Sequence, residues 1–388
     1  MLGAGKASAR MAEACEGILG ARIDSGLVIT KYGHARPLSR VQVLEAGHPL
    51  PDAAGLRGAR AMISLIKPSR PEDLILFLTS GGCSALLPAP TPPITLKEKQ
   101  GLTALLLRSG AAIQEINTVR KHISQTKGGR LAKLAFPATV INLIISDVVG
   151  DSLDSIGSGP FVPDFSTFQE AWGVLDKYRL LKAAPRAIVY HLTAGIQRKA
   201  EETPKPGEPC FRKVHNFILA RNRSALTAAA AQARAFGLTT LLLTSQAQGE
   251  ARELAGFYGA LAKEIHFSGH PVKPPACLIA GGEPTVTVRG NGLGGRNMEL
   301  ALAVAREIKG LPKTVVLSAG TDGTDGPTDA AGAIVNGRTW DRARKKGIPL
   351  EKRLENNDSY PFFKEAGGLV ITGPTGTNVM DVHILLIS

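Results

Sequence analysis

A glycine-rich segment at residues 281–299 brings together residue types that suit the binding of an anion. Thr285–Val288 alternates polar and apolar side chains as a strand does, and Arg296 stands where a helix is expected to begin at Asn297. A helix N-terminus offers free N–H groups and a partial positive charge. A guanidinium adds a fork that fits carboxylate or phosphate. The segment predicts a site for a negatively charged ligand, with contacts from Gly294, Gly295, Arg296 and Asn297.

A second glycine turn, Gly-Ala-Gly-Lys-Ala-Ser at residues 3–8, presents Lys6 at the expected start of a helix. Ala7 stands where a P-loop needs Ser or Thr, and Ser8 stands where a dinucleotide-binding turn needs its third glycine. What remains is a lysine that could meet a phosphate or stabilise developing charge. An exposed lysine on a first helical turn is the alternative. The strand before this turn has almost no residues, so we expect either a late start or a trimmed chain.

The turn Thr-Ser-Gly-Gly-Cys-Ser at residues 79–84 follows an apolar strand and precedes a helix. Small residues in this position form an anion cradle from backbone N–H groups and hydroxyls. A tight turn without any ligand is the alternative. Cys83 has no identifiable histidine partner, so a thiol nucleophile is disfavoured. The predicted cradle for the cofactor consists of Ser80, Gly81, Gly82 and Ser84.

Two aspartate-rich loops also follow predicted strands. In the loop at 146–160, Asp147 and Asp151 could hold Mg²⁺ through one or two carboxylates. Asx turns would use the same residues without a metal. His48, in a stiff loop with Pro49, is either functional or bonded to the backbone.

The second aspartate-rich loop, at 318–329, contains Asp322 and Asp325. It lacks the residue order and the terminal glutamate of an EF-hand. We expect it to face Arg296 and Lys6 across a cleft. There it could bind metal, accept a proton from a substrate hydroxyl, or hold substrate hydroxyls.

Short apolar runs alternate with helical patterns along the whole chain, which predicts an α/β protein with mainly parallel, covered sheets. A polar stretch at 198–209 reads as a linker, or as a loop within one domain. With a linker there, the domains are 1–205 and 210–388. The predicted strands are Gly26–Thr30, Val41–Leu44, Leu74–Leu78, Val140–Ile145, Phe217–Leu219, Leu238–Thr244, Cys277–Ala280, Val315–Ser318 and Val382–Ile387.

Composition narrows the possible partners and the compartment. The net charge is +13 over 388 residues, but the basic residues are dispersed and aromatics make up only 5%, which disfavours nucleic acid. No apolar run reaches the ~18–20 residues of a membrane span, and the first residues do not resemble a signal peptide. Four scattered cysteines form no CxxC pair, so we expect a reduced cytoplasmic compartment and no zinc site. The oligomeric state stays open, and a homo-oligomer is allowed.

Taken together, these motifs resemble the class II glycerate kinases, whose C-terminal part is called the MOFRL domain. Each motif is modest alone, whereas their order and spacing are specific. Cys83 and Ser152 depart from the residues usual at their positions. The resemblance rests on Gly3–Ala7, Glu45–Pro49, Ser80–Gly82, Ser146–Pro160, Gly282–Glu283, Gly294–Glu299, Thr321–Asp329 and Gly373–Asn378.

The resemblance implies ATP-dependent phosphorylation of D-glycerate to 2-phosphoglycerate with Mg²⁺. It also implies a Rossmann-like N-terminal domain and a C-terminal α/β domain with its MOFRL region at about 275–385, around an interdomain cleft that holds the active site. Lys6 and Arg296 match the lysine and arginine that the family favours as active-site residues. We assign Asp322 as a further catalytic group, and Glu283 and Asp325 to the substrate.

Two other functions stay open on the sequence alone. Some relatives carry the name hydroxypyruvate reductase, which implies NAD(P)H chemistry, although the imperfect fingerprint at Gly3 speaks against it. A non-catalytic homologue that only binds anions is the third possibility.

Overall fold

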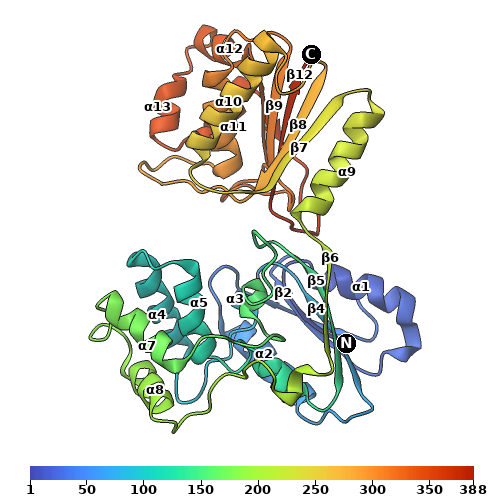
Figure 1. The fold of residues 1–388 in the computed structure, drawn as a ribbon, viewed down its shortest axis with the longest axis vertical. Helices are drawn as coiled ribbons and strands as arrows, with labels where there is room; N and C mark the ends of the chain where they lie inside the picture. The colour runs from blue at the N-terminus through green and yellow to red at the C-terminus, as the bar shows by residue number, and fades with distance from the viewer. The chain divides into compact units, whose positions relative to one another are not determined.

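Two six-stranded sheets form the framework of the computed structural model, which describes residues 1–388. The chain divides into two compact units, Met1–Leu219 and Ala220–Ser388. Each unit carries one sheet with helices on its faces (Figure 1), which confirms the predicted α/β fold. The boundary proposed from sequence at 205–210 lies within the first unit, before its last strand. None of the helices combines the length and apolar character that a bilayer-spanning segment needs.

The first sheet has the strand order β3-β2-β1-β4-β5-β6, and the five strands from β3 to β5 pair in parallel. From β1 the chain moves outward to β2 and β3, and it then returns to the other side of β1 to form β4. The order therefore reverses between β1 and β4, and in such sheets ligands bind at the carboxyl ends of the strands at this point. The strands are β1 Leu2–Ala4, β2 Leu27–Lys31, β3 Gln42–Ala46, β4 Leu74–Thr79, β5 Thr139–Ile145 and β6 Val214–Ala220.

Helices cover both faces of this sheet. Helix α1 packs on one face around Ala9 and Val28, and α2 and α6 pack on the other around Phe77. Asp52 caps the start of α2, since its carboxylate accepts the N–H of Gly55 at 2.8 Å. The helices are α1 Ser8–Leu19, α2 Ala53–Ile66, α3 Cys83–Leu86 and α6 Arg130–Ala135, with short 3-10 turns at Gly20–Arg22, Ile156–Ser158 and Pro209–Phe211.

Four more helices of the first unit pack on one another around a core of their own, which includes Leu106 and Phe168. Figure 1 shows them grouped together beside the sheet. Helices α4 and α7 each begin with a capping box, Thr95 with Glu98 and Thr167 with Glu170, which satisfies backbone N–H groups at the start of each helix. The four helices are α4 Leu96–Arg108, α5 Ile113–His122, α7 Phe168–Lys177 and α8 Arg186–Ile196.

The second sheet has the order β11-β10-β9-β12-β8-β7 and is mixed. Only β7 and β8 pair in parallel, because β12, the last strand, runs antiparallel between β8 and β9. The parallel arrangement expected for both sheets thus holds mainly for the first. The strands are β7 Thr239–Ala247, β8 Ala276–Gly282, β9 Thr314–Gly320, β10 Gly332–Asn336, β11 Leu369–Val370 and β12 Asp381–Ile387.

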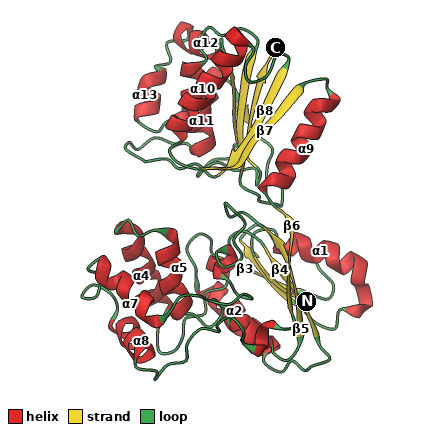
Figure 2. Ribbon diagram, viewed as in Figure 1, coloured by secondary structure: helices red, strands yellow, loops and turns green.

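Helix α9 covers one face of the second sheet, and α10 and α11 lie on the other (Figure 2). Helix α11 is buried on nearly all sides, because Met298 and the seven residues that follow it are inaccessible or nearly so. The helices are α9 Asn222–Ala235, α10 Ala251–Ser268, α11 Arg296–Glu307, α12 Thr339–Lys345, α13 Leu350–Glu355 and α14 Ser359–Ala366.

The predicted strand at Thr285–Val288 is wrong. Thr285 forms only an isolated bridge with Glu250, and the rest of the segment is loop. The loop's backbone is held by side chains instead, since Asn357 Oδ1 accepts the N–H of Arg289 at 2.8 Å. Helix α11 also begins one residue earlier than expected, at Arg296.

A substitution at Gly5 tests how closely the turn after β1 packs against the turn after β4. Its φ is +142°, and a Cβ there would lie 2.1 Å from Ser80 Oγ. We expect Gly5→Ala to lower the free energy of unfolding by about 2–4 kcal/mol, through backbone strain and overpacking. Urea unfolding followed by circular dichroism measures it.

Gly256 in α10 is the matched control, because nothing lies within 4 Å of the position that a Cβ would take there, and its φ is helical. Gly256→Ala should raise the free energy of unfolding by about 0.5–1 kcal/mol. Equal effects of the two substitutions would contradict the account of the Gly5 turn.

Candidate functional site

The turn that carries Lys6 is clamped between the neighbouring strands of the first sheet. Gly5 donates its N–H to Ile29 O, at 3.0 Å, on the side of β2. Lys6 donates its N–H to Gly81 O, at 2.8 Å, on the side of β4. The turns after β1 and β4 therefore meet at the point where the strand order reverses, which is where ligands bind in such sheets.

Ser80 supports this turn with its side chain. Its hydroxyl accepts the N–H of Ala7 at 3.0 Å and lies 3.2 Å from the hydroxyl of Ser8. Ser80 is 2% exposed, so the hydroxyl is used inside the protein to hold the start of α1. The ligand contact expected of Ser80 stays a prediction, and the structure adds a positioning role for it.

Gly82 lies next to the side chains of His48 and Lys6, two residues already considered in the sequence analysis. A Cβ on Gly82 would lie 2.8 Å from His48 Cδ2 and 3.5 Å from Lys6 Cγ. The φ of Gly82 is +85°, a conformation that favours glycine. Lys6, His48 and the Gly81–Gly82 backbone therefore form one local cluster at the carboxyl end of β4.

Ser84, in the first turn of α3, extends the cluster toward the helical part of the unit. Its hydroxyl accepts a hydrogen bond from Arg120 Nη2 at 2.6 Å and lies 3.0 Å from the hydroxyl of Ser158. Its carbonyl accepts a hydrogen bond from Lys127 Nζ at 2.8 Å. Arg120 and Lys127 were not singled out from the sequence.

The aspartate loop after β5 reaches the same region. Burial raises the pKa of the Cys83 thiol to about 11 against the opposing charge of Lys127, and the charge of Asp147 adds to the rise. Asp147 therefore lies near Cys83, and the thiol stays protonated and unsuited to nucleophilic attack. Asp151 and Ser158 have positive φ values of 55° and 62°, which are uncommon for residues other than glycine and show that the backbone of this loop is strained at two positions.

The carboxylates of this loop fit only one kind of magnesium site. No group of three or more His, Cys, Asp or Glu side chains anywhere in residues 1–388 is arranged to hold a metal ion. Mg²⁺ bound through one or two carboxylates, with substrate phosphates completing its shell, needs no such group. Asp147, half-buried beyond β5, and Asp151 are suitable for that kind of site, and their assignment stays a prediction.

Arg296, at the start of α11 in the second unit, is held by two carboxylates. Its Nε and Nη2 donate to the two oxygens of Asp381, at 2.6 and 3.1 Å. Its Nη1 donates to Glu283 Oε1 at 2.7 Å. Asp381 is 1% exposed, whereas the Glu283 side chain is 43% exposed. The guanidinium is thus fixed on its inner side by Asp381, and its outer partner is the one that a ligand anion could replace.

Asp325 caps the same helix. Its carboxylate accepts the N–H groups of Asn297 at 3.1 Å and Met298 at 2.8 Å. A Cβ on Gly295 would lie 2.3 Å from Asp325 Cγ, which explains the glycine there. Burial raises the pKa of Asp325 to about 6 even though these N–H groups oppose the rise. Both oxygens are engaged, so a substrate contact from Asp325 stays a prediction beside its observed role as a cap.

Behind Arg296 lies a buried polar chain formed by Asn297, Ser318 and His383. The Ser318 hydroxyl donates to Asn297 Oδ1 at 2.6 Å and lies 2.9 Å from His383 Nδ1. Burial, assisted by the charge of Arg296, lowers the pKa of His383 to about 3, so this ring is neutral. The Asn297 side chain therefore faces the interior, and its predicted contact with a cofactor rests on its position in the first turn of α11.

Asp322 lies in the turn after β9. Its Oδ1 accepts the N–H of Thr324 at 3.1 Å and the Thr324 hydroxyl at 3.0 Å. This is a local Asx-type turn, and it leaves the carboxylate partly exposed. The charge of Asp322 contributes to a raised pKa of Asp381, behind burial, which places Asp322 near the Arg296–Asp381 pair.

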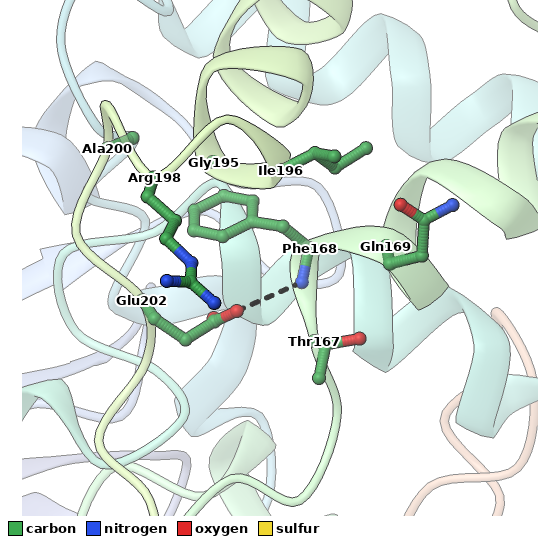
Figure 3. Close-up of a pocket in the computed structure, with 8 residues that line it drawn as sticks. All are labelled: Thr167, Phe168, Gln169, Gly195, Ile196, Arg198, Ala200 and Glu202. Carbon is green, nitrogen blue, oxygen red and sulfur yellow. Dashed lines mark hydrogen bonds between the residues drawn. The ribbon is translucent and has the colours of Figure 1, made fainter.

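A hollow of about 430 Å³ lies elsewhere in the first unit, between the start of α7 and the end of α8 (Figure 3). Its acidic residue, Glu202, accepts the N–H of Phe168 at 3.1 Å and pairs with His122 Nε2 at 2.9 Å. Burial alone would raise the pKa of Glu202, yet its hydrogen bonds, the first of them from His122, lower it to about 2. No predicted site residue lines this hollow, and its carboxylate is committed to structural partners.

Comparison with known proteins identifies the family of this chain. Residues 1–193 match a domain of unknown function, DUF4147, and residues 276–381 match the MOFRL family. The chain is 45% identical to a glycerate 2-kinase of Pyrococcus horikoshii, over 99% of this chain and 86% of that protein. The chain belongs to the class II glycerate kinase family. It is therefore an enzyme of the kinase class that phosphorylates an alcohol.

Two further members of the family bear on the fold and on the alternative function. A crystal structure of a glycerate kinase from Thermotoga maritima matches with a TM-score of 0.92 at 44% identity, and covers 100% of this chain and 91% of that one. A protein of Agrobacterium vitis named as a hydroxypyruvate reductase is 42% identical, over 100% of this chain and 98% of its own length. The cleft expected between the two halves stays a prediction.

Asp381 is the main residue of the second unit that sequence reasoning missed. It lies at the start of the final strand, more than 80 positions from its partner Arg296, and no glycine motif surrounds it. The preceding residue, Met380, has a φ of +68°, and this backbone conformation cannot be predicted from the sequence. Only the antiparallel pairing of β12 with β8 and β9 brings Asp381 beside the Arg296 turn.

The two carboxylates around Arg296 should differ in their effect on stability. We expect Asp381→Asn to lower the free energy of unfolding by about 1–3 kcal/mol, because it removes the buried carboxylate charge beside Arg296 and leaves the guanidinium only the exposed Glu283 as a counterion. Glu283→Gln should cost less than about 1 kcal/mol, because that pair is half exposed and screened by solvent. Urea unfolding of the two variants measures both. A larger loss for Glu283→Gln would contradict the assignment of Asp381 as the anchor.

Proposed function

We propose that this chain transfers the γ-phosphoryl group of ATP to the 2-hydroxyl of D-glycerate, giving 2-phosphoglycerate. The observation that carries the proposal is the pairing of the Lys6 turn with the Gly81–Gly82 turn at the reversal of strand order. An ammonium group beside a glycine backbone is suited to phosphate, and this is the place where such sheets bind their ligands. The names of the relatives supply the acceptor, glycerate, and the position phosphorylated.

The proposed roles follow from what each group can do at a phosphoryl transfer. Such a transfer needs positioning and positive charge around the transferring group, and little covalent chemistry from the protein. Lys6 contacts phosphate oxygens, and Arg296 binds an anionic group of a reactant in exchange for Glu283. Asp322, partly exposed near Arg296, accepts the proton of the attacking hydroxyl. Asp147 and Asp151 would hold Mg²⁺, which would supply positive charge beside the nucleotide phosphates.

A reductase remains the second candidate, because the first sheet has the strand order of dinucleotide-binding folds and one relative carries that name. Against it stands Ser8, which replaces the third glycine of the fingerprint and is bonded through its hydroxyl to Leu78 O at 3.0 Å. NADH absorbance with hydroxypyruvate, measured beside the kinase assay, separates the two activities.

The proposal is tested by ³¹P NMR of the product formed from ATP, Mg²⁺ and D-glycerate. We expect one new phosphomonoester signal, coupled to the proton on C2. Lys6→Ala and Arg296→Ala should each lower kcat/KM by about 10²–10³-fold, because each removes a cation from the transferring group or the reactant. Circular dichroism checks that both variants fold.

Lys97→Ala is the control for the loss of a lysine, since Lys97 is exposed on α4 and belongs to no predicted site. It should keep the kcat/KM of the parent protein. Parent-like values for both Lys6→Ala and Arg296→Ala would remove the assignment, and NADH oxidation without phosphoryl transfer would favour the reductase.

A further inference from the structure

Three cationic side chains are buried together in the first unit, on three different elements. Lys99 belongs to α4, Arg120 to α5, and Lys127 to the segment before α6. Lys99 is 3% exposed and Lys127 is 1% exposed. Arg120 and Lys127 both bond to Ser84, through its hydroxyl and its carbonyl. We call these three residues the buried cation cluster.

The cluster has no negative partner in the protein. Lys99 Nζ and Arg120 Nε are buried without any hydrogen bond. The charge that acts on Lys99 is that of Arg120, and Lys127 faces the positive charges of both together with the protonated Cys83. Buried cations in proteins are normally paired, because an unpaired one loses its hydration without compensation.

Lys121 shows what a satisfied buried lysine looks like in the same helix as Arg120. It is 5% exposed, and its Nζ lies 3.3 Å from Asp164 Oδ1 and 3.6 Å from Asp154 Oδ2. Lys121 is therefore paired with carboxylates, whereas the buried lysines Lys99 and Lys127 form no such ion pair.

Without a negative partner, the charged forms of the buried lysines are destabilised, and their pKa values fall. Burial, with the nearby charge of Arg120, lowers the pKa of Lys99 to about 7. Burial and the charges of Lys99 and Arg120 also lower the pKa of Lys127 well below its usual value. Three adjacent cations without a counterion are unfavourable in the empty protein. A bound anion would compensate their charge, as it does in preorganised binding sites.

The cluster adjoins the proposed active site. Ser84, which Arg120 and Lys127 contact, follows Gly82 by two residues, and Gly82 lies beneath Lys6 and His48. Ser84, Gly82 and Arg120 are only partly buried, whereas Lys99 and Lys127 are nearly inaccessible.

We propose that Lys99, Arg120 and Lys127 form a preorganised subsite for a compact oxyanion, a carboxylate or phosphoryl group of a reactant. The inference rests on the proposed kinase function for the identity of the reactants, D-glycerate or ATP. It does not rest on that function for the binding of an anion. The three cations bind and orient the anionic end, while the Lys6 turn next to them receives the transferring phosphate.

The first experiment is isothermal titration calorimetry at pH 8 without turnover, in Tris and in HEPES. D-glycerate, the ATP analogue AMP-PNP with Mg²⁺, and inorganic phosphate are the three probes. The anion should recharge lysines that are partly neutral in the empty protein, so binding should take up protons and its enthalpy should depend on the buffer. Lys99→Met should weaken the recognised probe about 10–100-fold, the range for one charged hydrogen bond, and should reduce the proton uptake.

The probes distinguish the two sources of the anion. A loss confined to D-glycerate assigns the cluster to the carboxylate, and a loss confined to AMP-PNP or phosphate assigns it to a phosphoryl group. Unchanged affinity of Lys99→Met for all three probes, with unchanged proton uptake, overturns the proposal. Lys97→Met is the control for the loss of an exposed lysine on the same helix, and should bind all three as the parent does.

The calorimetry also separates the inference from the proposed function. Probe binding that depends on Lys99 in a chain that forms no 2-phosphoglycerate would leave the subsite standing and remove the kinase proposal. Full kinase activity with binding that is indifferent to Lys99 would do the reverse.

The stability of the empty protein gives a second, independent readout. The folded-state pKa of Lys99, about 7, lies below its usual value, so between these two pH values the unfolded chain binds more protons than the folded one. The free energy of unfolding should therefore rise with pH above about 7. Lys99→Met should flatten this rise and increase the melting temperature of the ligand-free protein near pH 7, because it removes a buried amino group that has no hydrogen-bond partner.

Lys121→Met is the matched control, and we expect the opposite sign for it, because it strands Asp164 without its partner. A lower melting temperature for Lys99→Met than for the parent, by as much as for Lys121→Met, would mean that Lys99 is structurally satisfied and would overturn the proposal.

Discussion

The close contact between the turns after β1 and β4 is the constraint on which the first unit depends. A three-residue strand, β1, lies between β2 and β4, and beyond its carboxyl end the Gly5 N–H bonds to Ile29 O while the Lys6 N–H bonds to Gly81 O. Ser80 then ties this turn to the start of α1 through its hydroxyl. A side chain at Gly5 would separate the turns, and Lys6 would no longer stand beside the Gly81–Gly82 backbone.

Much of this architecture can be read from the sequence, because buried strands leave continuous apolar runs. Leu74–Leu78 is such a run, Val140–Ile145 is interrupted only by Asn142, and both form strands in the structure. Thr285–Val288 is the exception. It has a strand-like alternation, yet side chains bond the backbone of Thr287: its N–H donates to Glu250 Oε2 at 3.1 Å, and its carbonyl accepts from Asn357 Nδ2 at 3.4 Å. Local pattern predicts an element only where no tertiary partner competes for the same N–H groups.

The site is predictable to the extent that it depends on glycine. The turns at Gly5, Gly82 and Gly295 each require a residue without a side chain, and a run of glycines after a strand announces that need. Lys99 gives no such signal, since a lysine in an amphipathic helix normally faces solvent. Its burial follows from the packing of α4 against α5, and Asp381 likewise depends on the pairing of the last strand.

The cations of the two units differ in their counterions: Arg296 in the second unit has two carboxylate partners, whereas Lys99 in the first unit has none. Asp381 and Glu283 together already balance the charge of Arg296, so a carboxylate or phosphate that takes the place of Glu283, as proposed, would meet no net positive charge there. Such an exchange gains little from long-range attraction, and dissolved salt has correspondingly little influence on it. In the role proposed for it, the guanidinium at the head of α11 would discriminate by the directions of its N–H groups, and ligands that carry charge without planar oxygen pairs would have no advantage there.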